Sequence, residues 1–183
     1  MRAVFSACGA VAALSAALAL SACGDPFGGQ QPLLRTDSVT LASVNGPSEL
    51  PTAIDIAVND APAQPELPTE AGEWDFQVRS SGATYLLHPN PGIAPFRGAG
   101  LVRTTRAFDD PGTAPRDNES YTRTDQVIQP GEVYYVQSRQ RNGPCGSLAK
   151  FGIMKIIAIR ADSGVVHLAV TSNQNCDDER LEL

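Results

Sequence analysis

The chain has 183 residues, enough for one domain of ordinary size, and it is rich in glycine (16) and proline (14). Charged residues make up 19% of the chain, and the formal net charge is -6. An acidic chain without a basic stripe cannot neutralise phosphates, which argues against a nucleic-acid-binding protein. The composition also argues against a long coiled coil, which takes about half of its residues from Ala, Glu, Lys, Leu and Arg.

The N-terminus has the features of an export signal. Arg2 precedes an apolar stretch rich in Ala, Leu and Val that ends at Leu20, and residues 20–23 read Leu-Ser-Ala-Cys. A short apolar segment followed by small residues is typical of a secretory signal and not of a membrane-spanning helix. The motif resembles the bacterial lipobox, whose cysteine is linked to diacylglycerol before the chain is cleaved ahead of it. We therefore expect residues 1–22 to be a lipoprotein signal peptide and Cys23 to be lipidated. An ordinary cleaved signal that leaves Cys23 as a free thiol is the alternative.

The residues after the lipobox predict where the protein is held. Gly24, and not an Asp, follows the cysteine. In proteobacterial-type sorting, a residue other than Asp at this position favours export to the outer membrane. Acyl chains contribute about 0.8 kcal/mol per buried CH₂ group, so several of them anchor a domain persistently. We expect a lipid-anchored protein of the Gram-negative cell envelope. Residues 23–36 are predicted to be the lipidated cysteine and a flexible tether, and residues 37–183 a single β domain.

Two cysteines remain in the mature domain, Cys145 and Cys176. An even number of cysteines in an exported protein predicts a disulfide, and the turn predicted at residues 162–164 would bring the two together. The alternative is that Cys145 is a nucleophile, because Gly-Pro-Cys-Gly at 143–146 is similar to the surroundings of that residue in chymotrypsin-like viral cysteine proteases. Such an enzyme needs a histidine base and two barrels, and the mature chain is short for that. We assign no catalytic residue and expect a protein that is not an enzyme.

A metal site is not expected either. The two histidines are isolated in the sequence, and the two cysteines are far apart, so the close pairs of ligands typical of metal sites are missing. The acidic run at residues 177–179 is predicted to be a solvated tail.

Alternation of apolar and polar residues predicts a mostly β domain. Over residues 73–79, Trp74, Phe76 and Val78 share one face, which indicates a half-buried strand with its polar residues outside. Residues 151–159 are apolar on both faces apart from Lys155, which indicates an interior strand. Helix signals are nearly absent, so we expect an antiparallel sandwich or a curved two-sheet domain. The predicted strands cover residues 37–44, 52–58, 73–79, 101–108, 121–128, 131–136, 151–159 and 165–170, and the proline-rich residues 60–72 are predicted to connect two of them.

Three features combine into a family resemblance. Its strand pattern covers about residues 74–170. The first is the lipobox with its tether, and the second is Trp-Asp-Phe at 74–76 on a strand, followed by a glycine-containing stretch at 92–100. The third is the ending, where Val-Tyr-Tyr-Val at 133–136 leads into a Lys- and Phe-containing strand and a hairpin through Asp162 and Gly164. Together they resemble the HmuY-type haem-binding lipoproteins of Bacteroidetes-like bacteria.

The resemblance implies an all-β, non-enzymatic carrier that passes haem to a TonB-type outer-membrane receptor. The iron in that family lies between two axial His or Met side chains on loops, as haem iron requires two facing N or S donors. Residues 89–148 of this chain contain neither His nor Met, so the family's ligand pair has no counterpart there. The candidate ligand-binding residues are His88, predicted at the mouth of a loop, Tyr121 and Trp74, although Tyr121 and Trp74 are also ordinary packing residues. The ligand stays open as haem or another small apolar molecule. The alternative is an accessory envelope lipoprotein that works through protein–protein contacts without a ligand.

Overall fold

The computed structural model describes residues 31–57, 61–67, 72–142 and 145–182. The predicted signal peptide, the lipobox and Cys23 lie outside these residues. No helix within the described ranges is long and apolar enough to cross a membrane.

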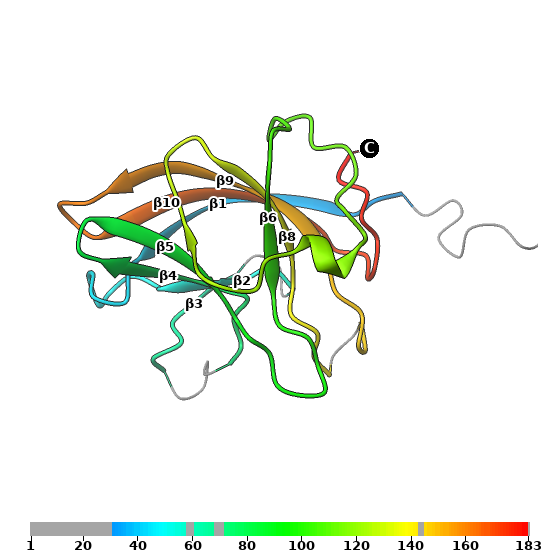
Figure 1. The fold of residues 1–183 in the computed structure, drawn as a ribbon, viewed down its shortest axis with the longest axis horizontal. Helices are drawn as coiled ribbons and strands as arrows, with labels where there is room; N and C mark the ends of the chain where they lie inside the picture. The colour runs from blue at the N-terminus through cyan, green and yellow to red at the C-terminus, as the bar shows by residue number, and fades with distance from the viewer. Residues whose placement is uncertain (1–30, 58–60, 68–71, 143–144, 183) are drawn as a thin grey trace, which may run out of the picture. The chain divides into compact units, whose positions relative to one another are not determined.

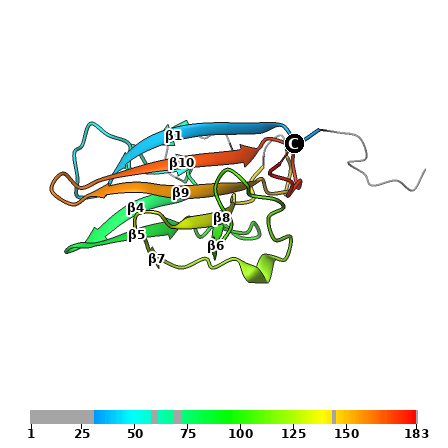
Figure 2. The same ribbon diagram turned by 90° about the horizontal axis from the view of Figure 1, so that it is seen from above.

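Ten strands form two antiparallel sheets of five strands each, as predicted for a β sandwich (Figures 1 and 2). In the first sheet the order is β1 (Leu34–Ala42), β10 (Val165–Asn173), β9 (Phe151–Arg160), β8 (Val133–Gln137) and β6 (Gly100–Thr104). In the second sheet the order is β3 (Ala61–Ala63), β2 (Ala53–Asp55), β4 (Phe76–Ser81), β5 (Thr84–Pro89) and β7 (Gln126–Val127). Within the described residues, the helical structure is limited to one 3-10 turn, Asn118–Ser120.

The main hydrophobic core lies between the two sheets. Five fully buried side chains from both sheets illustrate this core. The first sheet contributes Leu41 of β1, Met154 of β9 and Leu168 of β10, and the second contributes Phe76 of β4 and Leu87 of β5. Side chains alternate across a strand, so each of these residues is one member of a period-two pattern. Full burial of such a side chain contributes about 1.5–3 kcal/mol, which makes this interface the main source of stability.

The first sheet is covered on its other face as well. There Phe151 and Ile153 of β9 pack with Tyr135 of β8. Tyr121, at the end of the 105–121 loop, and Leu181, in the C-terminal segment, complete this cluster. The Tyr121 hydroxyl donates a hydrogen bond to the backbone of that loop. Burial on both faces explains why residues 151–154 are apolar, and it confirms the predicted interior strand for this half of β9, whereas Lys155 and the 48% exposed Ile157 face outward.

The β9–β10 hairpin carries the predicted disulfide. Cys145 precedes β9 and Cys176 follows β10, and their Cα atoms are 5.4 Å apart across the bond. The chain turns between the two strands at residues 161–164, where Gly164 has a φ of 69°. Only glycine adopts that backbone conformation without strain. The pairing of Cys145 with Cys176 is confirmed.

Several predicted elements differ in the structure. β1 begins at Leu34 and not at Asp37, and the strand predicted at 121–128 is reduced to β7 and an isolated bridge between Leu101 and Thr122. β5 was not predicted, because proline and histidine at its end resemble the start of a loop. His88 therefore lies within a strand and not at a loop mouth, and it is half-buried.

Two polar segments predicted to be exposed are buried. On the outer face of the strand at 73–79, Asp75 is 0% and Gln77 7% exposed, because other segments of the chain cover this face as well. Within the C-terminal acidic run, Asp178 is 2% exposed and binds Arg180, so the prediction of a solvated tail is wrong there.

Candidate functional site

Two acidic and two basic side chains form a buried ionic cluster. Asp75 accepts hydrogen bonds at Oδ1 from the backbone N–H of Arg139 at 2.8 Å and from its guanidinium at 3.3 Å. Asp55 Oδ2 accepts from the guanidinium of Arg139 at 3.2 Å and from that of Arg141 at 2.8 Å. Asp55, Asp75 and Arg139 are all nearly inaccessible to solvent, whereas the Arg141 side chain is 26% exposed.

The topology explains how the cluster forms. Asp55 ends β2 and Asp75 immediately precedes β4, and these strands are paired, with Ile54 opposite Phe76. Arg139 lies just after β8 of the first sheet. The ionic cluster therefore fastens the chain leaving the first sheet to the ends of two interior strands, β2 and β4, of the second sheet.

The electrostatics of the ionic cluster are set by burial. Burial raises the pKa of Asp75 to about 7, and the nearby Asp55 carboxylate adds to the shift, while Arg139 opposes it. Two carboxylates that share a site do not ionise independently, so a proton on Asp75 is stabilised near neutral pH. With that proton bound, the two guanidinium groups outnumber the remaining carboxylate.

A cavity of about 510 Å³ lies beside the ionic cluster and is called the groove here. One wall is the loop 91–96, with Ile93, Ala94 and Phe96, and the opposite wall is the segment 139–142. Ile93 is 77% exposed, the highest value among the large hydrophobic residues exposed in the described part of the chain. The groove thus has an apolar wall facing a wall of guanidinium and amide groups. Its remaining lining residues are Gly72, Glu73, Asn90 and Gly92.

The loop that forms the apolar wall is held firmly at its base. The buried side chain of Asn90 donates to the Trp74 carbonyl at 2.7 Å and accepts from the Gly92 N–H at 2.8 Å. The Asn90 carbonyl accepts from the Ala99 N–H at 2.8 Å. A Cβ on Gly98 would lie 2.3 Å from that same carbonyl oxygen, so only glycine allows the two ends of the loop to come this close.

The two walls of the groove are also joined directly. Gln140 donates its backbone N–H to the Arg97 carbonyl at 2.8 Å, and its side-chain oxygen accepts from the Arg97 N–H at 3.1 Å. Because the base and the far end of the loop are both fixed, Ile93 is presented to solvent by an ordered segment.

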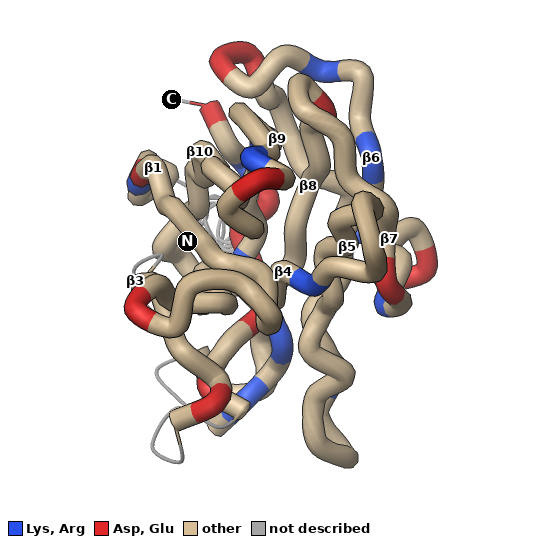
Figure 3. Tube along the Cα trace, turned by 90° about the vertical axis from the view of Figure 1, so that its left-hand side faces the viewer, with Lys and Arg blue, Asp and Glu red and all other residues tan. Residues whose placement is uncertain are grey.

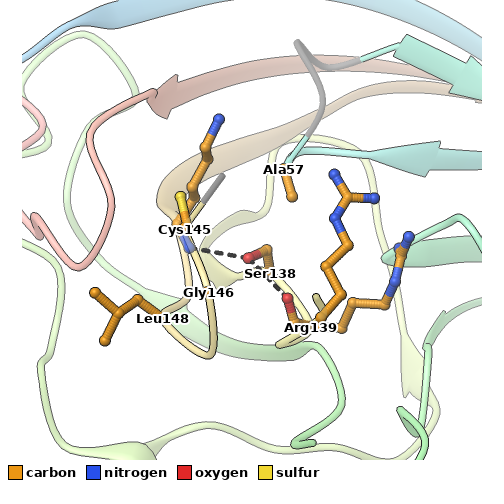
Figure 4. A pocket seen from close by; sticks show the side chains of 8 residues that line it. Ala57, Ser138, Arg139, Cys145, Gly146 and Leu148 are labelled. Carbon is orange, nitrogen blue, oxygen red and sulfur yellow. Dashed lines mark hydrogen bonds between the residues drawn. The ribbon is translucent and has the colours of Figure 1, made fainter. Parts of the chain in front are cut away.

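A second and much smaller cavity, of about 40 Å³, shares Arg139 and Arg141 with the groove in its lining (Figure 4). Ser138 and Arg139 lie between Ala57 and the loop that carries Cys145 and Leu148. The Ser138 hydroxyl accepts from the Lys150 N–H at 2.9 Å and donates to the Arg139 carbonyl at 3.2 Å. This cavity has room for a water molecule and not for a larger ligand.

The structure brings two of the three predicted ligand-binding residues together. The rings of Trp74 and His88 have centroids 5.7 Å apart, and Nδ1 of His88 shares a hydrogen bond with the Asp125 carboxyl group. The pairing of β5 with β7 places Asp125 beside His88. Tyr121 belongs to the hydrophobic cluster on the far face of the first sheet, where burial raises its pKa. Trp74 is 9% exposed and packs with small residues, as its alternative role of core anchor predicts.

The described residues do not fit a haem iron. His88 offers one nitrogen donor, but the side chain of Met154 is fully buried in the core between the sheets. His167 lies on β10 of the other sheet, and its Nδ1 shares a hydrogen bond with the Thr40 hydroxyl at 2.9 Å. In the described part of the chain, no three His, Cys, Asp or Glu side chains are grouped so that they could hold a metal ion. A facing axial pair for haem is therefore not formed by these residues.

The surface charges do not mark a site. In Figure 3, basic and acidic positions are interspersed along the chain trace and do not gather by sign. Arg103 pairs with Glu132, and Arg116 pairs with Asp177 and Glu179.

The residues that build the groove are not evident from the sequence. Ile93 was not identified because an apolar residue between prolines and glycines reads as an ordinary loop. The pair Gly92 and Gly98 was a usable signal, since glycines that flank a short apolar segment often allow close approach of the backbone. Arg139 and Arg141 were passed over, because their partners lie more than sixty residues away in the sequence.

Comparison of the chain with protein-family models, with curated proteins and with solved structures finds no match, so the functional argument depends on the residues and their geometry.

Proposed function

We propose that this chain is a lipid-anchored protein of the cell envelope whose β sandwich binds a small amphipathic ligand in the groove and does not transform it. Ligand sites are typically concave, of about 300–1,000 Å³, and apolar with a few polar groups. The groove has a volume of about 510 Å³, an apolar wall and an opposing wall with two guanidinium groups. This combination supports a binding site.

The observation that carries the proposal is the exposure of Ile93 on an ordered loop. Ile93 is 77% exposed in the free protein, and a ligand that covers this apolar side chain removes its surface from water, which favours binding. Because Asn90 and Gln140 already hold the loop, binding does not have to order it, which lowers the entropic cost.

The wall opposite indicates the polar end of the ligand. Arg141 is the more accessible of the two arginines, and Asp55 is its hydrogen-bond partner within the ionic cluster. Guanidinium groups bind carboxylates and phosphates through several parallel N–H groups. The ligand class is therefore a molecule with an apolar body and a carboxylate, which includes haemin with its propionates as well as fatty acids.

The place of action follows from the N-terminal motif. The lipobox at 20–23 supports lipidation of Cys23, and the Cys145–Cys176 disulfide is of the kind that persists outside the cytosol. An HmuY-like carrier that delivers its ligand to a TonB-type outer-membrane receptor is the form of this proposal that the family resemblance supports. The disulfide also leaves no thiolate at Cys145, which argues against the cysteine-protease alternative.

Fluorescence of Trp74 tests the ligand, because it is the only tryptophan of the chain and its carbonyl is bonded to Asn90 of the groove. The full chain in non-ionic detergent is titrated with haemin, and oleate is then added as a competitor. We expect saturable quenching that oleate reverses. Ile93→Ser and Arg141→Gln should each weaken binding about tenfold, whereas Ile157→Ser, at a 48% exposed position on β9, should leave it unchanged.

The same titration separates the possible outcomes. A Soret shift lost in His88→Ala would show iron ligation and place haem at His88 instead of the groove. Absence of saturable quenching, or equal loss in the Ile157→Ser control, would count against a ligand site in the groove. The accessory role through protein–protein contacts would then be favoured, with Ile93 and the 45% exposed Leu148 as its contact residues.

A further inference from the structure

β1 is a long strand at the edge of the first sheet (Figure 2). Its nine residues pair with β10 in one continuous register, and no other described strand is paired with it. An edge strand exposes a row of backbone N–H and C=O groups that can pair with another chain.

The hydrogen bonds at the two ends of β1 show which of its backbone groups face outward. The Leu33 carbonyl accepts from the Gln174 N–H at 2.8 Å, and the Ser43 N–H donates to the Gly164 carbonyl at 2.8 Å. Residues of an antiparallel strand alternate between facing the partner and facing away, so the odd-numbered residues of β1 face β10. The N–H of the even-numbered Ala42 points away from β10 and donates to the Pro51 carbonyl at 2.9 Å, which is consistent with this alternation. The outward-facing residues are Leu34, Thr36, Ser38 and Thr40.

The edge at β1 lacks most of the features that protect edge strands. Natural edges are shortened, bulged, covered, or furnished with proline or charged side chains, especially lysine. β1 has nine residues, no proline, no lysine and no register shift against β10, and its charged residues, Arg35 and Asp37, have opposite signs and pair with each other. The other edges of the described sheets are protected: β3 has three residues and contains Pro62, β7 has two residues, and β6 is bridged at Leu101 to Thr122.

We propose that two copies of this chain pair through β1, antiparallel about a two-fold axis at Thr36, so that their first sheets form one continuous sheet. In this register Thr36 lies opposite Thr36 of the second copy, and Leu34 lies opposite Ser38. These are outward-facing residues on both strands, and each such pair exchanges two backbone hydrogen bonds.

Charge complementarity selects the register and the partner. Between the hydrogen-bonded pairs, Arg35 of each copy lies opposite Asp37 of the other, at the type of position where side chains are closest. Within one chain these two residues form an exposed ion pair at 2.7 Å, so they have the charges and the reach required. A register centred one residue later would place Asp37 against Asp37, and one centred one residue earlier would place Arg35 against Arg35. Leu33, which is 62% exposed, gains a neighbour in Val39 of the second copy.

Cysteine cross-linking of the full chain in the membrane of its bacterial host tests the pairing. In Thr36→Cys the two thiols face each other at a Cα separation of about 5.5 Å, within the range of a disulfide. In Ser38→Cys the residues are about 14 Å apart along the strands, because each lies two residues from the axis and the two are offset by four residues at about 3.4 Å per residue. We expect a covalent dimer on mild oxidation of Thr36→Cys and none of Ser38→Cys. The unmodified chain controls for a free thiol at Cys23.

A charge swap in the Thr36→Cys background tests the selectivity. Asp37→Arg should reduce the cross-linked fraction at least fivefold, and Arg35→Asp should do the same, because each leaves like charges opposed. The double change Arg35→Asp with Asp37→Arg should restore cross-linking to the original level. Both side chains are exposed, so none of these changes disturbs the core, and an intact Cys145–Cys176 disulfide verifies the fold. No dimer from Thr36→Cys, equal dimer from Ser38→Cys, or failure of the double change to restore cross-linking would each overturn the proposal.

Discussion

Arg139 binds Asp75 twice, once through its backbone N–H and once through its guanidinium, and both bonds end on the same carboxylate oxygen. The second Asp75 oxygen accepts the Ile56 N–H at 2.9 Å. The carboxyl group therefore lies between the ends of β2 and β4 in the second sheet and the chain that leaves β8. This arrangement fixes the arginine wall of the groove relative to the sheet, and it makes the stability of the fold and the shape of the groove depend on the same contacts.

Removal of Arg139 should destabilise the domain strongly. Arg139→Ala leaves Asp55 and Asp75 buried beside each other without their shared cation, and breaking a buried ion pair in this way costs about 3–5 kcal/mol. Arg106→Ala is the matched control, because Arg106 is 60% exposed and 4.0 Å from Asp110, and such surface pairs contribute about 0–1 kcal/mol. Urea unfolding at neutral pH measures both. Similar losses for the two variants would contradict the assigned role of Arg139.

The buried Asp75 should make stability fall as the pH rises towards neutrality. Its pKa in the folded state is raised to about 7, above the value of about 3.9 in an unfolded chain, so the folded protein binds the extra proton between these values. The contribution of this group is therefore complete below about pH 4 and is lost as the pH rises through about 7, with a slope of at most about 1.4 kcal/mol per pH unit.

Urea unfolding of the wild type and of Asp75→Asn over this range isolates that contribution. The stability of the wild type relative to the variant should decrease between about pH 4.5 and about pH 7.5. Asp55→Asn provides a second variant, since removal of the neighbouring charge lowers the pKa of Asp75 and should flatten the dependence. A constant difference between wild type and Asp75→Asn across the range would show that Asp75 does not titrate there.

Asp178 should have the opposite effect at lower pH. Its hydrogen bonds with Arg180 lower the pKa of Asp178 to about 2, although burial opposes them. A lowered carboxyl pKa contributes stability above about pH 4 that is lost as the pH falls towards 2. Asp178→Asn should therefore resist acid unfolding relative to its own stability at pH 7, as followed by circular dichroism. Asp110→Asn is the control, because the Asp110 side chain is 74% exposed. Identical acid profiles for wild type and Asp178→Asn would contradict this.

The fold class followed from local patterns because each buried strand repeats its own signal. The alternation around Phe76 and the apolar run from Phe151 to Ile159 are produced by contacts that recur every two residues, so a short window reveals them. The disulfide was also predictable, because Cys145 and Cys176 flank one hairpin and their separation is set by its turn.

The candidate site could not be read in the same way. Asp75 and Arg139 are 64 residues apart, and Arg139 is buried only because both aspartates converge on it. A charged residue in a sequence is expected at the surface, and only the topology shows that this one is paired inside. The exposure of Ile93 depends likewise on the closure of a loop by Asn90 and Gly98, which no local propensity encodes.

Removal of the disulfide should lower stability without changing the topology. The bond closes a loop with a sequence separation of 31, and the chain-entropy model gives about 3–4 kcal/mol for a loop of this size. The double change Cys145→Ser with Cys176→Ser should lower the free energy of unfolding by this amount while Trp74 fluorescence of the folded state is retained. Reduction of the wild type with dithiothreitol provides the matched measurement. A loss below about 1 kcal/mol in both would show that the hairpin is held by packing alone.

A methyl group at Gly98 should disrupt the groove more than the fold. The added Cβ would lie 2.3 Å from the Asn90 carbonyl, so the loop 91–96 has to move away from its base, and overpacking of this kind costs about 1–3 kcal/mol. Gly82→Ala is the control: its Cβ meets open space, and its cost comes only from a φ of 60°, about 1 kcal/mol. Haemin quenching of Trp74 should weaken at least tenfold in Gly98→Ala and stay unchanged in Gly82→Ala, with urea unfolding as the measure of stability. If Gly98→Ala unfolds more readily but binds haemin as well as the wild type does, the ligand does not lie against this loop.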